Sequence, residues 1–190
     1  FITEFLGNRI FRSNTIGTDI VRWGEKGISD GQLLGPQFLA VDNRGYLYVT
    51  EAGNHRVSKF DFDGNFILSF GEKDQPFGGL KLPTGIFVYN ETVFVADAQE
   101  KHIAAFDLSG NFLYTFGKSF LDGPEGLSLF EEGILLVADT RRVLTYHIDS
   151  QVFTVIAEFG GLGTRITNAA RDVNGDILVV DFFGNTVTLL

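Results

Sequence analysis

The stretch LYVTEAGNHRVSKFD, residues 47–61, holds two strand-like runs separated by the polar loop AGNH. Val, Tyr, Phe and Thr favour β-strands, and a short loop rich in Gly and Asn favours a hairpin. The stretch recurs as VFVADAQEKHIAAFD at 93–107, as LLVADTRRVLTY at 135–146 and as LVVDFFGNTVTL at 178–189. The start of the chain fits the same pattern, with Glu4 and Arg9 in the places of Glu51 and Arg56. One β-hairpin is therefore predicted to repeat along the chain.

Other positions keep the same spacing. The second strand of each unit ends on a carboxylate, 42–47 residues after the previous one: Glu4, Glu51, Asp97, Asp139 and Asp181. Pro36, Pro83 and Pro124 open three units, and Trp23 and a column of Phe residues close the units as expected blade-packing residues. Four short strands in a unit of this length are typical of a propeller blade. The sequence predicts an all-β fold, a β-propeller of four-stranded antiparallel blades.

The pattern resembles a known repeat family. Pro-x-Gly-hydrophobic, then Tyr-Val-Thr-Glu-x-x-Asn-His-Arg-Val, then Phe-Asp-x-x-Gly-Asn-Phe and Phe-Gly is similar to the NHL repeat, which builds six-bladed β-propellers. The resemblance is strong over 36–71 and good over 83–117, where Glu100 and His102 replace the usual Asn and Arg. It is looser afterwards, because the third hairpin is shortened and Thr186 replaces Arg.

The resemblance implies one propeller segment over residues 1–190. It divides into a partial blade at 1–24, complete blades at 36–71, 83–117 and 124–160, and a partial blade at 168–190. These units supply fewer strands than a six-bladed ring, and open ends leave strand edges unpaired. We therefore expect the ring to be incomplete in this chain and to be completed by the rest of a longer protein. Closure by dimerisation is the alternative.

Composition excludes several classes of protein. The chain has 190 residues, 44% apolar and 21% charged, which is enough for a buried core. It contains no apolar run of the length that a membrane span requires, so we expect no membrane insertion. A net charge of −9 disfavours a nucleic-acid partner. The absence of Cys excludes disulfides and thiolate metal sites in this chain.

Propeller topology assigns the loops to two faces. The hairpins between second and third strands share one face with the blade-to-blade crossings, which are the longer and more polar loops. Because binding residues concentrate on loops of rigid scaffolds, we expect this face to bind a protein or a small ligand. The candidate residues are Asn54, His55, Arg56, Lys101, His102, Arg141, Arg142 and Asn185.

The pairs Glu51…Arg56 and Glu4…Arg9 allow two interpretations. The arginines could hold an anionic ligand, or each pair could be an ion pair across its hairpin. Recurrence from blade to blade favours the second interpretation, an exposed structural pair worth about 0.2–1 kcal/mol.

Catalytic and metal-site patterns are weak. His55 and His102 lie a blade apart and His147 lies further along its strand, so they do not converge on one ion. The run from Asp61 to Asn65 looks like a calcium loop, but Phe66 stands where that loop needs Gly, so we expect a hairpin turn. The strands predicted to line the channel carry no metal ligand. We therefore expect no catalytic residue, cofactor site or metal site here.

The predicted function is a non-catalytic scaffold, as a sensor or interaction domain of a larger protein. The alternative is part of a metal-dependent propeller enzyme of the lyase or lactonase kind, because some NHL-type propellers resemble lyases with an axial metal. RNA binding, known among NHL domains, needs a basic face, and the charge of −9 disfavours it. The resemblance also suggests a bacterial envelope or secreted protein.

Overall fold

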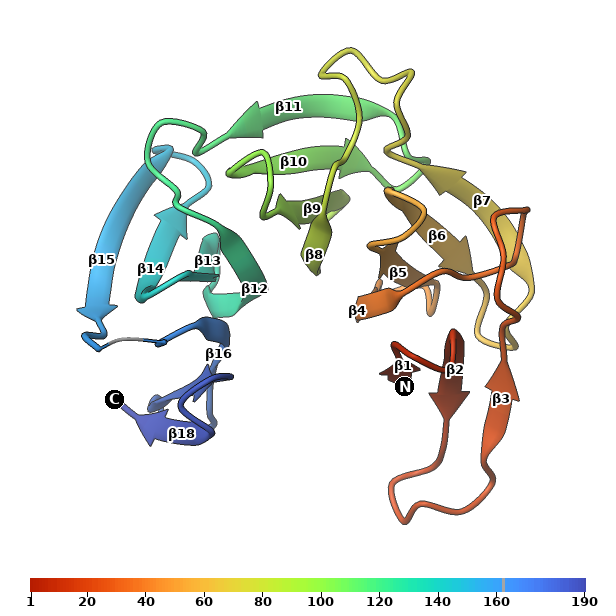
Figure 1. Ribbon diagram of the computed structural model, residues 1–190, viewed down its shortest axis with the longest axis horizontal. Coiled ribbons are helices and arrows are strands. Elements are labelled where there is room, and N and C mark those ends of the chain that lie inside the picture. Colours follow the sequence, from red (N-terminus) through yellow and green to blue (C-terminus); the bar gives the residue numbers. More distant parts are fainter. Residues whose placement is uncertain (162) are drawn as a thin grey trace.

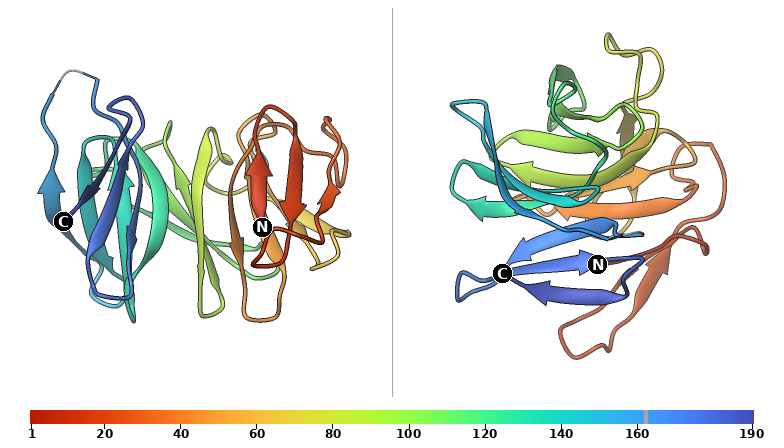
Figure 2. Two further views of the ribbon diagram at one scale, coloured as in Figure 1. Left: turned by 90° about the horizontal axis from the view of Figure 1, so that it is seen from below. Right: turned by 60° about the vertical axis from the view of Figure 1, so that its left-hand side comes forward.

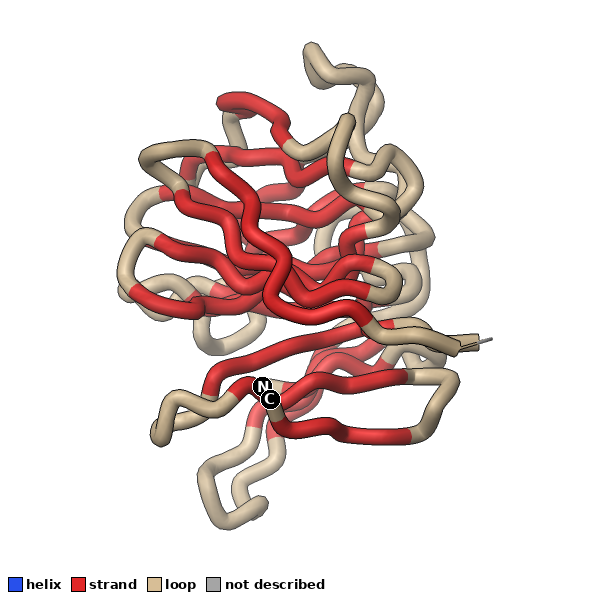
Figure 3. The backbone as a smooth tube through the Cα atoms, turned by 90° about the vertical axis from the view of Figure 1, so that its left-hand side faces the viewer, coloured by secondary structure: helices blue, strands red, loops and turns tan. Residues whose placement is uncertain are grey.

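The computed structural model describes residues 1–161 and 163–190, and this part of the chain contains only strands and loops (Figure 3). The strands form five antiparallel sheets, each ordered as in the sequence. The sheets stand side by side in an arc, with β4, β8, β12 and β16 nearest its centre (Figure 1). No helix that could span a membrane occurs in the described residues. The prediction of an all-β propeller with antiparallel blades is confirmed.

Three blades have four strands and two have three. Blade 1 contains β1 (Ile2–Glu4), β2 (Arg9–Arg12) and β3 (Val21–Trp23). Blade 2 contains β4 (Pro36–Val41), β5 (Leu47–Glu51), β6 (Arg56–Phe60) and β7 (Phe66–Phe70). Blade 3 contains β8 (Pro83–Tyr89), β9 (Thr92–Asp97), β10 (His102–Asp107) and β11 (Phe112–Phe116).

The remaining two blades complete the arc. Blade 4 contains β12 (Pro124–Glu131), β13 (Ile134–Asp139), β14 (Arg142–His147) and β15 (Val152–Glu158). Blade 5 contains β16 (Ile166–Arg171), β17 (Ile177–Asp181) and β18 (Thr186–Leu189). Blades 1 and 5 end the arc on either side of an opening (Figures 1 and 2). The structure thus contains five blades, and the six-bladed ring remains a prediction.

Apolar side chains alternate between the two neighbours of each blade. In β5, Val49 packs toward Ile10 of blade 1, while Tyr48 packs toward Phe106 of blade 3. This alternation follows from the two-residue period of a strand. Trp23 packs beside the cluster between blades 1 and 2, in agreement with its predicted structural role. The hydrophobic core is therefore a series of separate layers between blades.

The innermost strands approach one another closely near the arc's centre. A Cβ atom added at Gly85, in β8, would overlap the backbone carbonyl oxygen of Glu125, in β12. Backbone atoms cannot move aside as a flexible side chain does. Glycine at this position is therefore required by the spacing between blades 3 and 4.

We predict that Gly85→Ala destabilises the protein by about 1–3 kcal/mol or more, the usual cost of overpacking. Gly160→Ala is the control, because a Cβ atom added at Gly160 has no neighbouring atom within 4 Å and the backbone of Gly160 does not have a positive φ angle. Urea unfolding of the two variants measures the difference. Equal stability of both variants would contradict the close approach of β8 and β12.

Candidate functional site

The surface that carries the candidate residues is called here the loop face. It consists of the hairpins at 5–8, 52–55, 98–101, 140–141 and 182–185 and the crossings at 24–35, 71–82, 117–123 and 159–165. Leu162, within the last crossing, lies outside the described residues. The opposite surface, made of all other strand connections, is called the turn face.

In blades 2 to 5, a carboxylate at the end of the second strand holds the crossing that enters the blade. Asp97 accepts hydrogen bonds from the backbone N–H groups of Lys81 (2.6 Å) and Leu82 (3.1 Å). Asp139 accepts from Asp122 and Gly123 in the same way. Both carboxylates are fully buried.

The same clamp occurs in blades 2 and 5. Glu51, also fully buried, accepts a hydrogen bond of 2.9 Å from the Leu34 N–H group. Asp181 accepts one of 3.0 Å from the Arg165 N–H group, and this bond is the main reason that its pKa is lowered. The clamps fix the crossings, and so the crossings form a defined surface.

The prediction that Glu51 and Arg56 form an exposed ion pair is wrong. Arg56 Nε lies 2.9 Å from Glu51 Oε1, but the two side chains are only 5% and 0% exposed. The preceding crossing covers the pair, and the carbonyl oxygens of Ser29 and Gln32 each accept a 3.0 Å hydrogen bond from Arg56. Arg56 is therefore committed to structure and is not available to an anionic ligand.

Glu4 and Arg9 form the corresponding pair in blade 1. Their Nε and Oε2 atoms are 3.1 Å apart, and both side chains are 42% exposed. This pair matches the prediction for a pair near solvent. The same two positions of the repeat thus differ in burial from blade to blade.

The crossings differ in length, and this difference shapes the loop face. Those at 24–35 and 71–82 are longer than those at 117–123 and 159–165. Over blade 4, the short crossings border a cleft of about 770 Å³. Smaller clefts of about 400 and 300 Å³ lie on the same face near the junctions of blades 2 and 3 and of blades 1 and 2.

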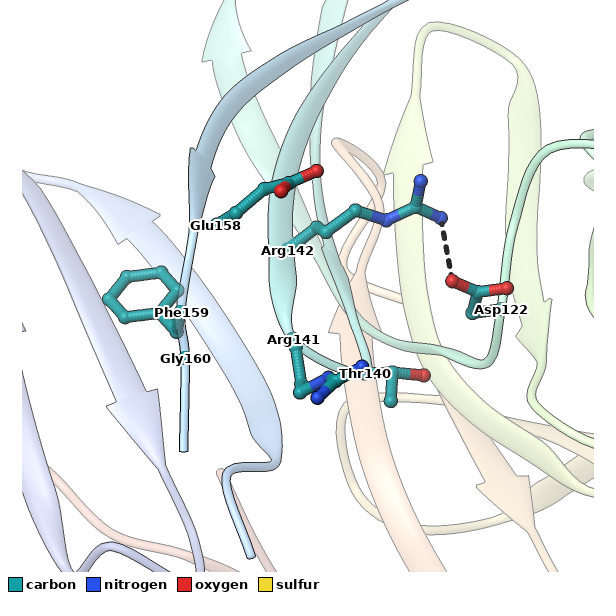
Figure 4. Close-up of a pocket in the computed structure, with 7 residues that line it drawn as sticks. All are labelled: Asp122, Thr140, Arg141, Arg142, Glu158, Phe159 and Gly160. Atoms are coloured by element: carbon teal, nitrogen blue, oxygen red, sulfur yellow. Dashed lines mark ion pairs between the residues drawn. The ribbon is translucent and has the colours of Figure 1, made fainter. Parts of the chain in front are cut away.

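The cleft of about 770 Å³ brings two candidate residues together (Figure 4). Arg142 pairs with Asp122 (3.3 Å) and with the buried Asp139. Arg141 is exposed and lines the same cleft, as does the exposed Glu158. Arg142 therefore stabilises the wall of the cleft, and Arg141 is the cation there that has no ion pair with any described residue.

Of the other candidate residues, one is hydrogen-bonded within its hairpin and three are exposed on the loop face. Asn54 donates hydrogen bonds to Gly27 (3.0 Å) and Glu51 (2.7 Å), so it helps to fix the hairpin. His55 is exposed, and its Nδ1 lies 2.5 Å from the Lys81 carbonyl oxygen at the 400 Å³ cleft. Lys101 and Asn185 are exposed at hairpin tips. Lys73 and Lys81 line the cleft beside His55, but they lie in a crossing and not in a hairpin, so the hairpin sequences did not identify them. The length of the crossing at 71–82 is the feature of the sequence that could have pointed to them.

His102 is buried rather than exposed. Its side chain packs edge-on against Phe77, with ring centres 5.9 Å apart, and its Nε2 has no hydrogen-bond partner among the described residues. Burial lowers the pKa of His102, against the opposing effect of Asp97. Like Arg56, His102 is therefore not accessible to a binding partner at the surface.

The two faces differ in charge. The loop face carries both signs in similar numbers: Lys26, Lys73, Lys81, Lys101, Lys118, Arg141 and Arg165 against Glu25, Asp30, Glu72, Asp74, Glu100 and Asp122. Among described residues, the connections of the turn face carry Arg44 as their basic residue against Asp19, Asp42, Asp61, Asp63, Glu91, Glu132, Asp149, Asp172 and Asp176. The net negative charge of the chain thus lies mainly on the turn face.

The calcium-like run at 61–65 is a hairpin turn. Asp61 Oδ1 accepts hydrogen bonds from the backbone N–H groups of Asp63 and Asn65, each 2.9 Å long. Asp107 and Asp172 make the same type of turn in other blades. The described residues contain no group of three or more His, Cys, Asp or Glu side chains placed to hold a metal ion.

Comparison with known proteins identifies the repeat. The profile of the NHL repeat matches residues 33–60. Protein brain tumor of Drosophila melanogaster is 28% identical over 142 residues, which are 73% of this chain and 14% of that protein. Protein lin-41 of Caenorhabditis elegans is 46% identical over 48 residues, 25% of this chain and 4% of that protein. The chain thus spans a small part of these relatives. Because they are animal proteins, they give no support to the expected bacterial origin.

Solved structures share the fold. A catalytically inactive virginiamycin B lyase from Staphylococcus aureus, determined with quinupristin, superposes with a TM-score of 0.74 at 17% identity, covering 98% of this chain and 60% of that one. A chain of a nidogen/laminin complex gives a TM-score of 0.70 at 18% identity, covering 82% of this chain and 60% of that one. At these identities the likeness shows the fold alone.

We predict that Glu51→Gln lowers the free energy of unfolding by about 3–5 kcal/mol, because the buried Arg56 charge loses its buried partner and keeps only the more distant, half-exposed Glu72 at 3.6 Å. Glu4→Gln makes the same change in the exposed pair and should cost about 0.2–1 kcal/mol. Urea unfolding at neutral pH tests both. Similar costs for the two variants would show that burial does not distinguish the pairs.

The buried His102 should make the stability of the protein depend on pH. The unfolded chain takes up a proton on His102 near its ordinary pKa of 6.5, whereas the folded chain resists protonation. Stability should therefore fall as pH decreases through 6.5, by at most about 1.4 kcal/mol per pH unit. His102→Phe should lose this dependence between about pH 6.5 and 5, above the range in which Asp side chains titrate. An unchanged pH profile of unfolding in the variant would contradict the prediction.

Proposed function

We propose that this chain, a β-propeller that contains an NHL repeat, is a binding scaffold that presents its loop face to a protein partner. The observation that carries the proposal is the clamping of every crossing entering blades 2 to 5 by a strand-end carboxylate. A surface whose loops are already ordered loses less conformational entropy on binding. The loop face therefore has the rigidity that a recognition surface requires.

The shape and charge of the loop face support the same proposal. Three clefts of about 300 to 770 Å³ lie on it, and these can receive side chains of a partner. Because the loop face carries charges of both signs, it does not repel acidic proteins strongly, whereas the acidic turn face does. A similar propeller fold occurs in a nidogen/laminin complex, an example of this architecture in a protein–protein assembly.

Ring closure by one further blade is part of the proposal. Ile2 occupies in β1 the position of Val49 in β5, but Ile2 is 63% exposed and Val49 is fully buried against blade 1. At the other end of the arc, Leu178 is 40% exposed, whereas the corresponding Leu136 is fully buried against blade 5. Both terminal blades thus present apolar surfaces that inner blades bury, and a blade of the same repeat would cover both.

Site-specific photo-cross-linking in the full-length protein tests the proposed face. A photoreactive amino acid is placed at Arg141 or Lys73 on the loop face, and at Val173, fully exposed on the turn face, as a control. We expect the two loop-face positions to cross-link the same protein and the Val173 position not to do so. The purified partner should then bind Arg141→Glu at least about ten-fold more weakly than the unchanged protein.

Two results would contradict the scaffold function. Cross-linking of the partner from Val173 alone would place the binding surface elsewhere. Stoichiometric metal in the full-length protein, together with a reaction that loop-face substitutions abolish without unfolding, would favour an enzyme.

A further inference from the structure

A buried lysine fills the junction between blades 2 and 3 near the turn face. Lys59, in β6, pairs across the sheet with Tyr48, and its Nζ lies over the rings of Tyr46 and Tyr48, 4.5 and 4.9 Å from their centres. The same Nζ donates a hydrogen bond of 2.7 Å to the carbonyl oxygen of Leu108, in the first turn residue after β10. Aromatic rings attract ammonium groups. Two rings of one blade and a carbonyl of the next therefore hold this cation.

Blade 1 makes a related contact with an arginine. Arg12 stands in β2 where Lys59 stands in β6, counted from Arg9 and Arg56. Its Nη1 donates a hydrogen bond of 2.6 Å to the Phe62 carbonyl oxygen in the next blade, and its guanidinium lies 4.3 Å from the centre of the Phe62 ring. Two successive blade junctions thus use a cation at this position.

The third junction has a small apolar residue at the same position. Ala105, in β10, pairs across the sheet with Phe94, as Lys59 pairs with Tyr48. Ala105 also pairs with Tyr114 of β11 on its other side. No side chain from this position can reach toward blade 4 as Lys59 reaches toward blade 3.

A cavity of about 460 Å³ lies at this third junction. Three of its lining residues occupy the positions of the groups around Lys59: Thr92 for Tyr46, Phe94 for Tyr48 and Ile148 for Leu108. The correspondence follows from the strand ends, since Leu108 and Ile148 each directly follow a third strand. The volume falls within the usual range of ligand sites.

The rim of the cavity is acidic. Glu132 and Asp149, from two turns of blade 4, line it, and neither forms an ion pair with a described residue. Both side chains are exposed on the turn face, whose summed negative charge attracts cations. Tyr114 and Phe94 supply aromatic walls. An ammonium or guanidinium group on an alkyl stem suits this combination.

We infer that the cavity between blades 3 and 4 binds a lysine or arginine side chain of a partner protein. The cation enters from outside and takes the place that Lys59 fills from within at the preceding junction. The aromatic walls and the carboxylates of Glu132 and Asp149 hold it. The inference concerns the turn face and does not depend on which protein binds the loop face.

NMR titration of the isotope-labelled protein with the peptide acetyl-Gly-Lys-Gly-amide tests the inference. The amide signals of Gly133 and Ile148 should shift in a saturable manner. Peptides with norleucine or Nε-acetyl-lysine in place of lysine should bind roughly ten-fold or more weakly, since they lack the charge. Equal binding of the norleucine peptide would overturn the inference by showing an apolar pocket, as would the absence of any shift with the lysine peptide. Butylammonium chloride as a probe distinguishes a free organic cation: binding tighter than that of the peptide would overturn the assignment to a protein side chain.

Variants of the rim provide a matched comparison. Glu132→Gln combined with Asp149→Asn should weaken lysine-peptide binding at least about five-fold. Asp176→Asn makes a similar charge change on the turn face of blade 5, outside the cavity, and should leave binding unchanged in about 0.15 M salt, where the Debye length is about 8 Å. Equal effects of the rim and control variants would overturn the inference.

A final variant fills the cavity from within. Ala105→Lys places a lysine where β6 has Lys59, and it should abolish peptide binding while the melting temperature stays the same or rises. Undiminished peptide binding by the folded variant would contradict the site. If the variant does not fold, the rim variants decide the question, because they change only exposed side chains.

Discussion

The loop face depends on one repeated interaction, the carboxylate at the end of a second strand that binds backbone N–H groups of the incoming crossing. Asp97 and Asp139 are fully buried, so their charges need these hydrogen bonds to offset the loss of hydration. Each crossing comes from the preceding blade. The same bond therefore fixes a loop and ties neighbouring blades together, which makes fold and recognition surface parts of one arrangement.

The repeat explains how much could be predicted from sequence. Strand-forming runs, hairpin residues and evenly spaced carboxylates predict the blades, because each of these features is local. Burial of the Glu51–Arg56 pair could not be predicted in this way, since the covering carbonyls of Ser29 and Gln32 belong to a crossing well before the hairpin. The burial of His102 could not be predicted either, because Phe77, which packs against it, belongs to a crossing distant from the hairpin in sequence.

The candidate sites were predictable only in part. Arg141 could be found from its hairpin, but the cleft beside it results from the short crossings around blade 4. The change from Lys59 to Ala105 is visible in the sequence once the blades are aligned. Its consequence, a cavity with an acidic rim, requires the turns of blade 4 to be placed in space. The two faces thereby offer different chemistry, with clefts among mixed charges on one and an acidic surface on the other.

Amide hydrogen exchange at the crossings tests directly whether the strand-end carboxylates hold these loops. Leu82 and Gly123 lie outside the strands, yet their N–H groups are bound to Asp97 and Asp139. We predict that these amides exchange as slowly as those of the adjacent strands β9 and β13, because opening them requires the blades to separate. Exchange as fast as in the exposed turns of the turn face would show that the carboxylates do not hold the crossings.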